Sequence, residues 1–439
     1  MNYIPHDAES INEMLKRISI ENIEELFQDI PKGLRIKKLN IPSGLSEPDL
    51  LRRLQKLSYK NKLYESSFMG AGCYYHYIPS LVDFIINRSE FYTSYTPYQA
   101  EASQGFLQAI YEYQTLIIRL TQMDIANASM YDGSTALAEA AIMATIITNK
   151  KHILMVEGIH PEYIEVVKTY CWAQNINFKI ISEENLENEP TENAAAVLFQ
   201  SPNFFGDIED ILSLSRKVKE KSPNCLLIQV MTDPTCLGVL NPPGSTEIDI
   251  FVAEGQSFGI SPSFGGPGLG IFTTKEKYLR KLPGRLVGKT REINGKKEGF
   301  ILTLQTREQH IRREKASSNI CTNQALCSLA ALIYLLSLGK TGLYEVAKQN
   351  FQKSHYLKNQ LALIQKYKIL NKKPTYNEFL LKCPNIDTLI EQCKINNLLP
   401  PLKLSKYYPK MDDVVLVCVT EMNSNKSIQK FIDIAKNSI

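Results

Sequence analysis

The chain has 439 residues, of which 44% are hydrophobic and 22% are charged, and its formal net charge is +4. This length suits one large domain with a smaller one, and the composition is that of a soluble globular protein with a sizeable core. Because 50 basic residues are balanced by 46 acidic ones, we expect no face that binds nucleic acid or a membrane.

The nine cysteines are scattered without a CxxC pair, and the six histidines form no HExxH motif. This usage is typical of reduced thiols and predicts no metal site. The sequence pattern leads us to expect no leader segment and no apolar run of membrane-spanning length. The expected location is therefore the cytoplasm.

Residues 1–65 have the pattern of polar, amphipathic helices separated by proline and glycine breaks. Ser10 and Glu13 have capping-box spacing at the start of the first helix. One helical stripe contains Ile11, Met14, Leu15 and Ile18. Such a segment cannot bury a core alone, so we expect a helical arm that packs on a larger body or on a partner.

Residues 66–344 are predicted to form a large α/β domain. Helices are expected over Gln104–Thr121 and Ser134–Ile147, and further helices over Tyr163–Trp172 and Ile208–Lys219 alternate with short apolar runs. Alternation of this kind indicates a parallel-rich sheet covered on both faces. The apolar runs are Ile153–Val156, Phe178–Ile181, Ala195–Phe199, Leu226–Val230, Ile248–Val252 and Leu269–Phe272.

Residues 345–439 are predicted to form a small C-terminal α/β domain. A long helical region over Glu308–Leu336 leads into it, and its strands are expected at Phe379–Leu381 and Val414–Val419. The charged stretch Thr306–Lys315 is interpreted as a solvated helix face, with an anion site as the alternative.

The sequence Tyr131–Ala136 (YDGSTA) enters a predicted helix. The free N–H groups of a helix start and the hydroxyls of Ser134 and Thr135 suit a phosphate. The alternative is that Asp132 or Ser134 only caps the helix.

Two further side chains follow predicted strands at the carboxyl edge of the sheet, where open parallel sheets place their ligands. Asp233 follows Leu226–Val230 and could hold a pyridinium nitrogen protonated, or could begin a turn with Pro234. His160 follows Ile153–Val156 and could stack on a flat cofactor ring, or could be an ordinary loop histidine.

Gly265–Gly270 (GGPGLG) precedes a predicted strand and does not open a helix, so it is interpreted as a tight turn and not as a dinucleotide loop. Tyrosines are dense between residues 74 and 113, which favours an interface, with an ordinary core edge as the alternative. They are Tyr74, Tyr75, Tyr77, Tyr92, Tyr95, Tyr98, Tyr111 and Tyr113.

Six segments together resemble the P-protein family of the glycine cleavage system (glycine dehydrogenase, decarboxylating). The likeness spans nearly the whole chain and corresponds to the alpha subunit (subunit 1), the amino-terminal half of the fused form. The segments are Ser67–Tyr77, Tyr95–Glu101, Tyr131–Ala136, Glu254–Gly259, Phe264–Gly270 and Leu304–Leu326.

The resemblance implies a fold type I pyridoxal-phosphate (PLP) architecture with a degenerate site. Aligned on the glycine-rich turn, Gly255 takes the family's histidine position, and Gln256 occupies the Schiff-base lysine position. An amide is not a nucleophile toward an aldehyde, so no catalytic residue, covalent cofactor or metal is expected in this chain. The implied degenerate pocket comprises Ser134, Thr135, His160, Asp233, Gln256 and Ser257.

The resemblance also implies partners. A beta subunit would carry PLP in an alpha2beta2 complex, glycine would be decarboxylated there, and the aminomethyl group would pass to the lipoyl arm of the H protein. The tyrosines expected at the interface or at the wall of the active site are Tyr95, Tyr98, Tyr75 and Tyr77.

Two alternatives remain open at this point. The chain could be a self-sufficient PLP enzyme that uses another lysine, such as Lys275 or Lys289. It could also be a non-catalytic regulatory or scaffold protein descended from the same fold.

Overall fold

The computed structural model describes residues 6–36, 38–92, 96–293, 295–320 and 322–438. The chain divides into two compact units, Met1–Leu63 and Tyr64–Ile439. The first unit ends close to the predicted arm boundary at residue 65. The division of the remainder at residue 345 stays a prediction, since Tyr64–Ile439 forms one unit.

The described part of the first unit contains the α-helices α1 (Ala8–Arg17) and α2 (Glu47–Ser58), with short 3-10 turns at Ile23–Phe27 and Lys32–Leu34. Asp7 caps α1 by accepting a hydrogen bond from the Ser10 N–H at 2.8 Å, so the predicted cap at Ser10 is wrong. The helix therefore starts earlier than predicted. Neither helix buries a residue, so apolar side chains of both remain partly exposed.

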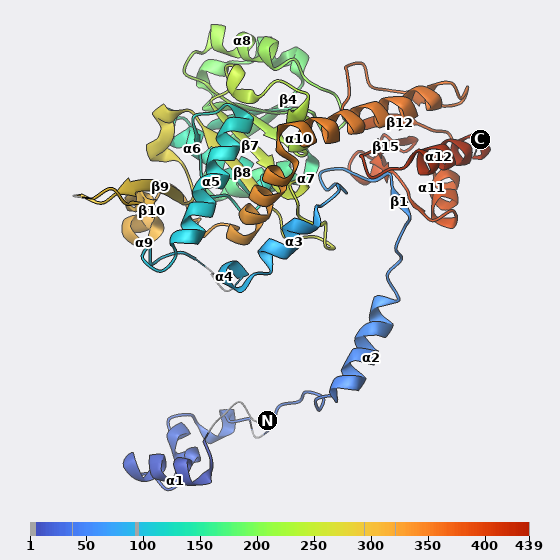
Figure 1. The fold of residues 1–439 in the computed structure, drawn as a ribbon. Coiled ribbons are helices and arrows are strands. Elements are labelled where there is room, and N and C mark those ends of the chain that lie inside the picture. Colours follow the sequence, from blue (N-terminus) through green and yellow to red (C-terminus); the bar gives the residue numbers. More distant parts are fainter. Residues whose placement is uncertain (1–5, 37, 93–95, 294, 321, 439) are drawn as a thin grey trace. The chain divides into compact units, whose positions relative to one another are not determined.

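The second unit is built on a seven-stranded mixed sheet with the order β2-β8-β7-β6-β5-β3-β4. Figure 1 labels β4, β7 and β8 of this sheet. Five strands run parallel, and β8 returns antiparallel to β7, so the parallel-rich prediction is confirmed while the Leu269–Phe272 run proves antiparallel. The strands are β2 (Ile125–Ala126), β3 (His152–Val156), β4 (Asn177–Ile181), β5 (Ala196–Gln200), β6 (Leu226–Met231), β7 (Ile250–Glu254) and β8 (Gly270–Thr274).

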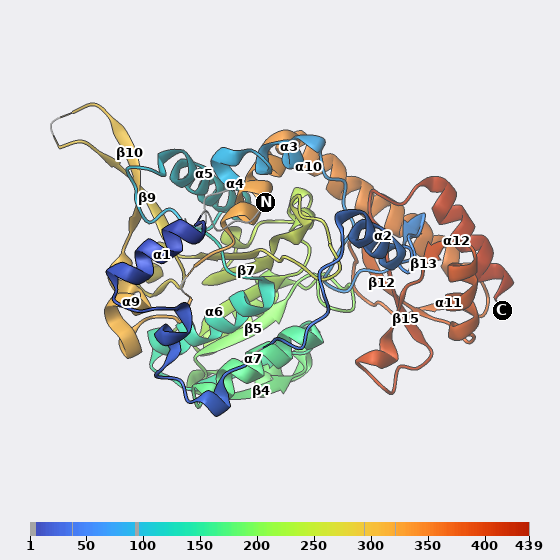
Figure 2. The same cartoon turned by 90° about the horizontal axis from the view of Figure 1, so that it is seen from below.

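Helices cover both faces of this sheet because successive side chains of each buried strand point to opposite sides. In β3, Leu154 belongs to one apolar core and Ile153 to the other. α5 (Gln104–Thr121), α8 (Ile211–Lys221) and α10 (Ala325–Ala362) supply the first core. α6 (Gly133–Thr148) and α7 (Pro161–Ala173) supply the second (Figure 2).

The predicted long helix over Glu308–Leu336 is wrong in its first half. The chain forms a 3-10 turn (Gln305–Arg307), α9 (Gln309–Arg312) and another turn (Arg313–Lys315) before α10 begins at Ala325. Arg313 has φ +52°, which ends the helix, and the serines and asparagine that follow favour local hydrogen bonds over helix.

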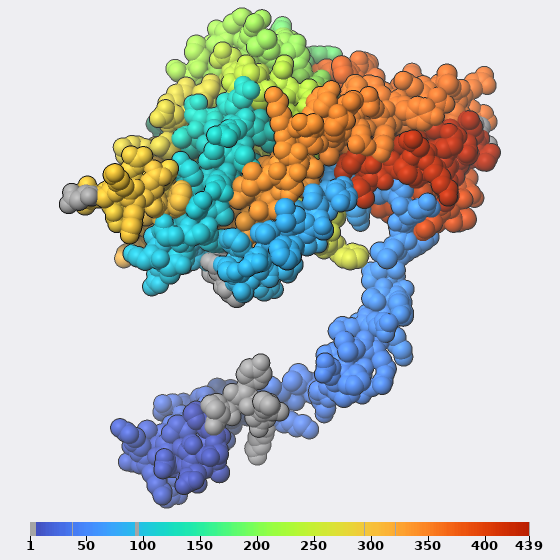
Figure 3. All heavy atoms as spheres, viewed as in Figure 1, coloured from blue at the N-terminus to red at the C-terminus, as the bar shows by residue number. Residues whose placement is uncertain are grey.

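Helix α10 packs against α5 and α3 (Ser80–Ile86), as Figure 3 shows on the near face. It is interrupted at Gly339, whose φ of 59° and ψ of −172° are not helical. Among the described residues, α10 alone is long and apolar enough to cross a membrane by length and composition. The expectation of no such run is wrong by that measure, although residues of α10 also contribute to the core.

Smaller elements complete the unit. α4 (Ser89–Tyr92) precedes α5, and β9 (Leu286–Arg291) pairs with β10 (Glu298–Thr303) as an antiparallel hairpin. Towards the C-terminus, a four-stranded sheet contains β11 (Lys368–Ile369), β12 (Glu378–Lys382), β15 (Val414–Cys418) and β14 (Leu402–Lys403), with α11 (Ile386–Ile395) and α12 (Asn425–Asn437). β1 (Ser66–Ser67) pairs with β13 (Leu398–Leu399).

Candidate functional site: an altered cofactor pocket

A cavity of about 290 Å³ lies at the carboxyl ends of the parallel strands. It brings together three of the six predicted pocket residues, Ser134, His160 and Gln256, whereas Thr135, Asp233 and Ser257 do not line it. The other lining residues are Ala71, Gly72, Cys73, Asp132, Glu162, Tyr163, Glu254, Pro262 and Gly265 to Gly268.

The start of α6, which the sequence offered as a phosphate site, is capped by carboxylates. Asp132 Oδ1 accepts from the Thr135 N–H at 2.8 Å and from the Ser134 hydroxyl at 2.6 Å. The Gly133 N–H donates to Glu254 Oε2 at 2.9 Å. Carboxylates of the protein thus bind these N–H groups and supply the negative charge that the helix dipole favours. This arrangement favours the alternative in which Asp132 caps the helix and no phosphate binds there.

Glu254 was not predicted as a site residue, although it ends an otherwise apolar strand two residues before Gln256. Its carboxylate also accepts from the N–H groups of Gln256 and Leu269, each at 2.9 Å. Burial raises the pKa of Glu254 to about 7, and these N–H donors oppose the rise. A charged residue at the end of a buried strand was the signal that could have found it.

Gln256 is bound at both ends of its amide. Its Nε2 donates to the Ile260 carbonyl, and its Oε1 accepts from the Tyr74 N–H at 3.2 Å. The neighbouring Ser257 hydroxyl is buried and has no hydrogen-bond partner among the described residues. Gln256 therefore holds the loop after β7 against the segment around Tyr74.

His160 is held as a neutral imidazole. Its Nδ1 accepts from the Glu162 N–H at 3.1 Å, so its Nε2 carries the proton that it donates to the Ala71 carbonyl at 2.9 Å. Burial lowers the pKa of His160, consistent with this state. Gly72 lies against the ring, because a Cβ added there would be 3.0 Å from two of its atoms.

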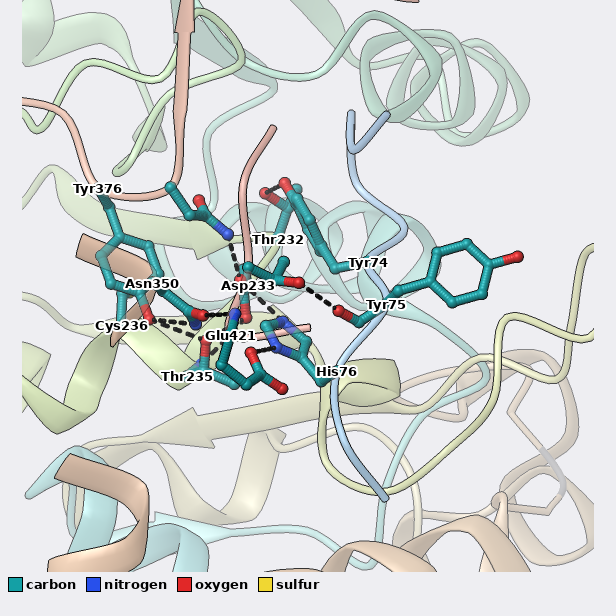
Figure 4. A network of polar contacts seen from close by, with 12 residues as sticks. Tyr74, Tyr75, His76, Thr232, Asp233, Thr235, Cys236, Asn350, Tyr376 and Glu421 are labelled. Carbon is teal, nitrogen blue, oxygen red and sulfur yellow. Dashed lines mark hydrogen bonds and ion pairs between the residues drawn. The ribbon is translucent and has the colours of Figure 1, made fainter. Parts of the chain in front are cut away.

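Asp233 lies deeper, 4% exposed, in a polar cluster away from the cavity lining (Figure 4). Its Oδ2 is 3.2 Å from His76 Nε2 and accepts from Asn377 Nδ2 at 2.7 Å. Its Oδ1 accepts from the Thr235 hydroxyl at 2.7 Å. His76, which sequence reasoning missed, is therefore its charged partner.

The four tyrosines predicted for an interface are not equivalent. Tyr75, Tyr77 and Tyr98 are exposed, whereas Tyr95 lies outside the described residues. The Tyr98 hydroxyl accepts from Arg285 at 3.0 Å, and the guanidinium lies 4.6 Å from the centre of its ring. Other members of the dense stretch, Tyr74 and Tyr113, are core residues.

Neither lysine proposed as an alternative anchor reaches the cavity. The Nζ atom of Lys275 is 3.4 Å from Oδ1 of Asp249. Asp249 directly precedes β7, so this pair lies at the edge of the sheet opposite the cavity. Lys289 is on the β9–β10 hairpin and pairs with Glu298 at 2.5 Å. Among the described residues, no lysine or arginine lines the cavity.

Together, the order of the sheet, the helices on both faces and the position of the cavity define a fold type I PLP-dependent enzyme fold with an altered cofactor pocket. A C-DES variant with glycine covalently linked to its PLP cofactor matches with a TM-score of 0.61 at 14% identity, covering 88% of this chain and 99% of that one. At this identity the likeness shows the fold alone.

The family model for the glycine cleavage system P-protein matches residues 1–435. The chain is 46% identical over 440 residues to the probable glycine dehydrogenase (decarboxylating) subunit 1 of Desulforamulus reducens, covering 98% of each. It matches a crystal structure of glycine decarboxylase (P-protein) in inhibitor-bound form with a TM-score of 0.91 and 37% identity, each chain fully covered. The chain belongs to the glycine cleavage system P-protein family.

The pocket of this chain does not fit PLP, the cofactor that the fold implies. A phosphate group carries nearly two negative charges, and the carboxylates of Asp132, Glu162 and Glu254 line the cavity without a compensating lysine or arginine among the described residues. Gln256 provides no amine for a covalent bond. No chemical step is therefore assigned to a cofactor in this pocket.

Proposed function

We propose that the chain is the subunit of a two-subunit glycine dehydrogenase (decarboxylating) that does not hold the cofactor, and that it acts with a beta subunit in an alpha2beta2 complex. The observation that carries the proposal is full-length similarity to relatives named subunit 1, in a chain with glutamine at the lysine position. The regulatory or scaffold alternative and the self-sufficient enzyme are not favoured by this match.

In the proposed complex, PLP is held by the beta subunit and supplies an electron sink when carbon dioxide leaves glycine. The aminomethyl group then passes to the lipoyl arm of the H protein. The part of this chain is to form the subunit interface and one wall of the site, for which exposed Tyr75, Tyr77 and Tyr98 are the candidates. A cytoplasmic location belongs to the same proposal, supported by the free thiols of the described cysteines.

Glycine–bicarbonate carbon exchange tests the proposal directly. The chain and a candidate beta subunit, purified separately and then mixed with H protein, should exchange label, while either subunit alone with H protein should not. Exchange by the beta subunit alone at the rate of the mixture would overturn the proposal, and so would exchange by this chain alone.

The isolated chain is expected to yield no stoichiometric pyridoxyl-lysine after incubation with PLP and borohydride reduction. The reason is that Gln256 replaces the lysine and that no described lysine lines the cavity. Peptide mapping is the measurement, with the reconstituted complex as the positive control. Weak labelling spread over surface lysines is expected, whereas one dominant site would contradict the prediction.

Tyr98→Ala is expected to weaken association with the beta subunit about thirtyfold, since truncating a tyrosine anchor removes roughly 2 kcal/mol of binding free energy. Titration calorimetry measures the affinity. Circular dichroism checks that the variant still folds, because Tyr98 contacts the buried Arg285. Tyr344→Ala is the matched control, because Tyr344 is also exposed and also lies beside a cation, Lys348. Equal affinities of the two variants for the beta subunit would mean that Tyr98 is an ordinary surface residue and not an interface anchor.

A further inference from the structure

The segment Gly70–Tyr77, here called the strap, borders the altered cofactor pocket, and its residues Ala71, Gly72 and Cys73 line the cavity. Its residues alternate in exposure: Tyr74 and His76 are 1% and 8% exposed, whereas Tyr75 and Tyr77 are 51% and 56% exposed. Figure 4 shows Tyr75 pointing away from the buried cluster. The strap therefore has an anchoring side and a presenting side.

On the anchoring side, the imidazole of His76 lies between two carboxylates. Its Nε2 is 3.2 Å from Asp233 Oδ2, and its Nδ1 is 2.8 Å from Glu421 Oε2. Since an ionised carboxylate only accepts hydrogen bonds, both ring nitrogens must carry protons to serve both partners. A planar aromatic cation thus faces Asp233, the carboxylate that its place at a strand end offered as a partner for a pyridinium nitrogen.

The other contact points of a cofactor are also taken by the protein. The carboxylate of Glu254 occupies the start of α6, where a phosphate would bind. The Gln256 amide accepts from the Tyr74 N–H, and His160 donates to the Ala71 carbonyl. In two of these three contacts the partner is a backbone group of the strap. Residues that follow β3 and β7, at the sheet edge where a cofactor would lie, therefore hold the strap in place.

The strap is tied equally to the C-terminal sheet. Glu378 of β12 accepts from the Ala71 N–H and from the Tyr74 hydroxyl, each at 2.7 Å. Glu421 accepts from the Tyr77 N–H at 2.6 Å through its second oxygen, and the Tyr75 carbonyl accepts from Thr420 at 2.8 Å. Glu421 therefore links the charge of His76 to the backbone that carries Tyr77.

We propose that the strap is a built-in replacement for the cofactor, in which the imidazolium of His76 serves Asp233 as a pyridinium would, and that this anchoring presents Tyr75 and Tyr77 to the beta subunit. His76 is in these terms a positioning residue. The presentation of Tyr75 and Tyr77 to the beta subunit rests on the proposed function, whereas the replacement of the cofactor by the strap concerns this chain alone.

The charge of His76 gives the proposal a pH signature. Burial opposes protonation, but the charges and hydrogen bonds of Asp233 and Glu421 outweigh it and raise the pKa of His76 to about 10. A histidine whose pKa is raised on folding stabilises the protein fully below about 6.5 and loses that contribution as the pH rises to about 10. The stability of the isolated chain should therefore fall across this window.

Neighbouring groups leave part of this window to His76. Burial raises the pKa of Glu378 to about 7, so its contribution is lost between pH 4.5 and about 7. Buried thiols begin to lose theirs as the pH approaches 9, so the range that belongs to His76 lies between about pH 7 and 8. Burial lowers the pKa of Lys353 from 10.5, so its contribution has the opposite sign and raises stability as the pH approaches 10.5. Burial also raises the pKa of three neighbouring tyrosines and two neighbouring thiols, so their contributions to stability fall only from about pH 9 upward: Tyr74, Tyr334, Tyr376, Cys236 and Cys418.

Chemical rescue of His76→Ala tests the proposal. The variant should lose at least about 5 °C of melting temperature and at least tenfold in affinity for the beta subunit, and millimolar imidazole should restore much of both. His355→Ala is the matched control, because His355 contacts a neutral carbonyl, that of Thr375, and imidazole should not rescue it. Failure of imidazole to restore the melting temperature of His76→Ala would overturn the replacement.

A melting temperature that is restored while affinity never changed would overturn the positioning role. Failure of the wild-type chain to bind any beta subunit would refute the proposed function. The melting temperatures of the isolated chain would still test whether the strap replaces the cofactor. If His76→Ala does not fold, the double variant His76→Gln with Asp233→Asn replaces the ion pair by amides. It should fold and lose the fall in stability between pH 7 and 8, and a retained fall over that range would overturn the proposal.

Discussion

Asp233→Ala is expected to lower the free energy of unfolding by about 3–5 kcal/mol, because removing one partner of a buried ion pair leaves the other charge uncompensated. Here the imidazolium of His76 would keep only Glu421, and Asn377 and Thr235 would lose their acceptor. Although burial acts to raise it, the charge of His76 lowers the pKa of Asp233, so the carboxylate is ionised at neutral pH.

Urea unfolding followed by circular dichroism measures this loss. Asp413→Ala is the control, since Asp413 forms a solvent-exposed pair with Lys382 and its removal should change stability by no more than about 1 kcal/mol. A loss for Asp233→Ala as small as that of the control would mean that the buried pair contributes little.

Gly206→Ala is expected to be at least as damaging, with a loss of roughly 3–6 kcal/mol from backbone strain and overpacking together. Gly206 has φ +89°, and an added Cβ would lie 2.2 Å from the Glu378 carbonyl oxygen. The obstacle is backbone of β12, so it cannot rotate away. The shift would also disturb the side chain of Glu378, which holds Ala71 and Tyr74.

Gly265→Ala separates the two causes. Gly265 has φ +117° but nothing within 4 Å of an added Cβ, so this variant carries strain without a clash and should lose about 1–3 kcal/mol. The midpoints of urea unfolding of the two variants are the comparison. Equal losses would show that the backbone near Glu378 yields to the added methyl group.

Much of the large α/β sheet could be predicted from the sequence, because its strands are buried on both faces and are therefore continuously apolar. The helix over Gln104–Thr121 was predicted with the bounds that the structure has. The direction of β8 was missed. The stretch Gly255–Leu269 contains no α-helix, and a parallel strand needs a crossover connection that is usually helical, so the antiparallel return could have been inferred.

The candidate site was harder to predict, since its contacts join residues far apart in the chain. The apolar run before Asp233 placed that carboxylate at the strand end, but nothing local identified His76, 157 positions away, as its partner. Of the two alternatives at Ser134, the contacts favour the helix cap over a phosphate site, because Glu254, 121 positions from Gly133, supplies a carboxylate from within the protein. Local patterns locate groups at the edge of a sheet, whereas their pairing depends on tertiary packing.

The alternation of the strap restricts how its length can change. Residues 74 and 76 face the protein and residues 75 and 77 face outward, so a single insertion or deletion between Gly70 and Tyr74 would exchange the two sets. Tyr75 and Tyr77 would then be driven inward, and the imidazolium would be carried out into solvent. A substitution within the strap changes one side chain at a time, whereas a change of its length by one residue exchanges the buried, anchoring set for the exposed set.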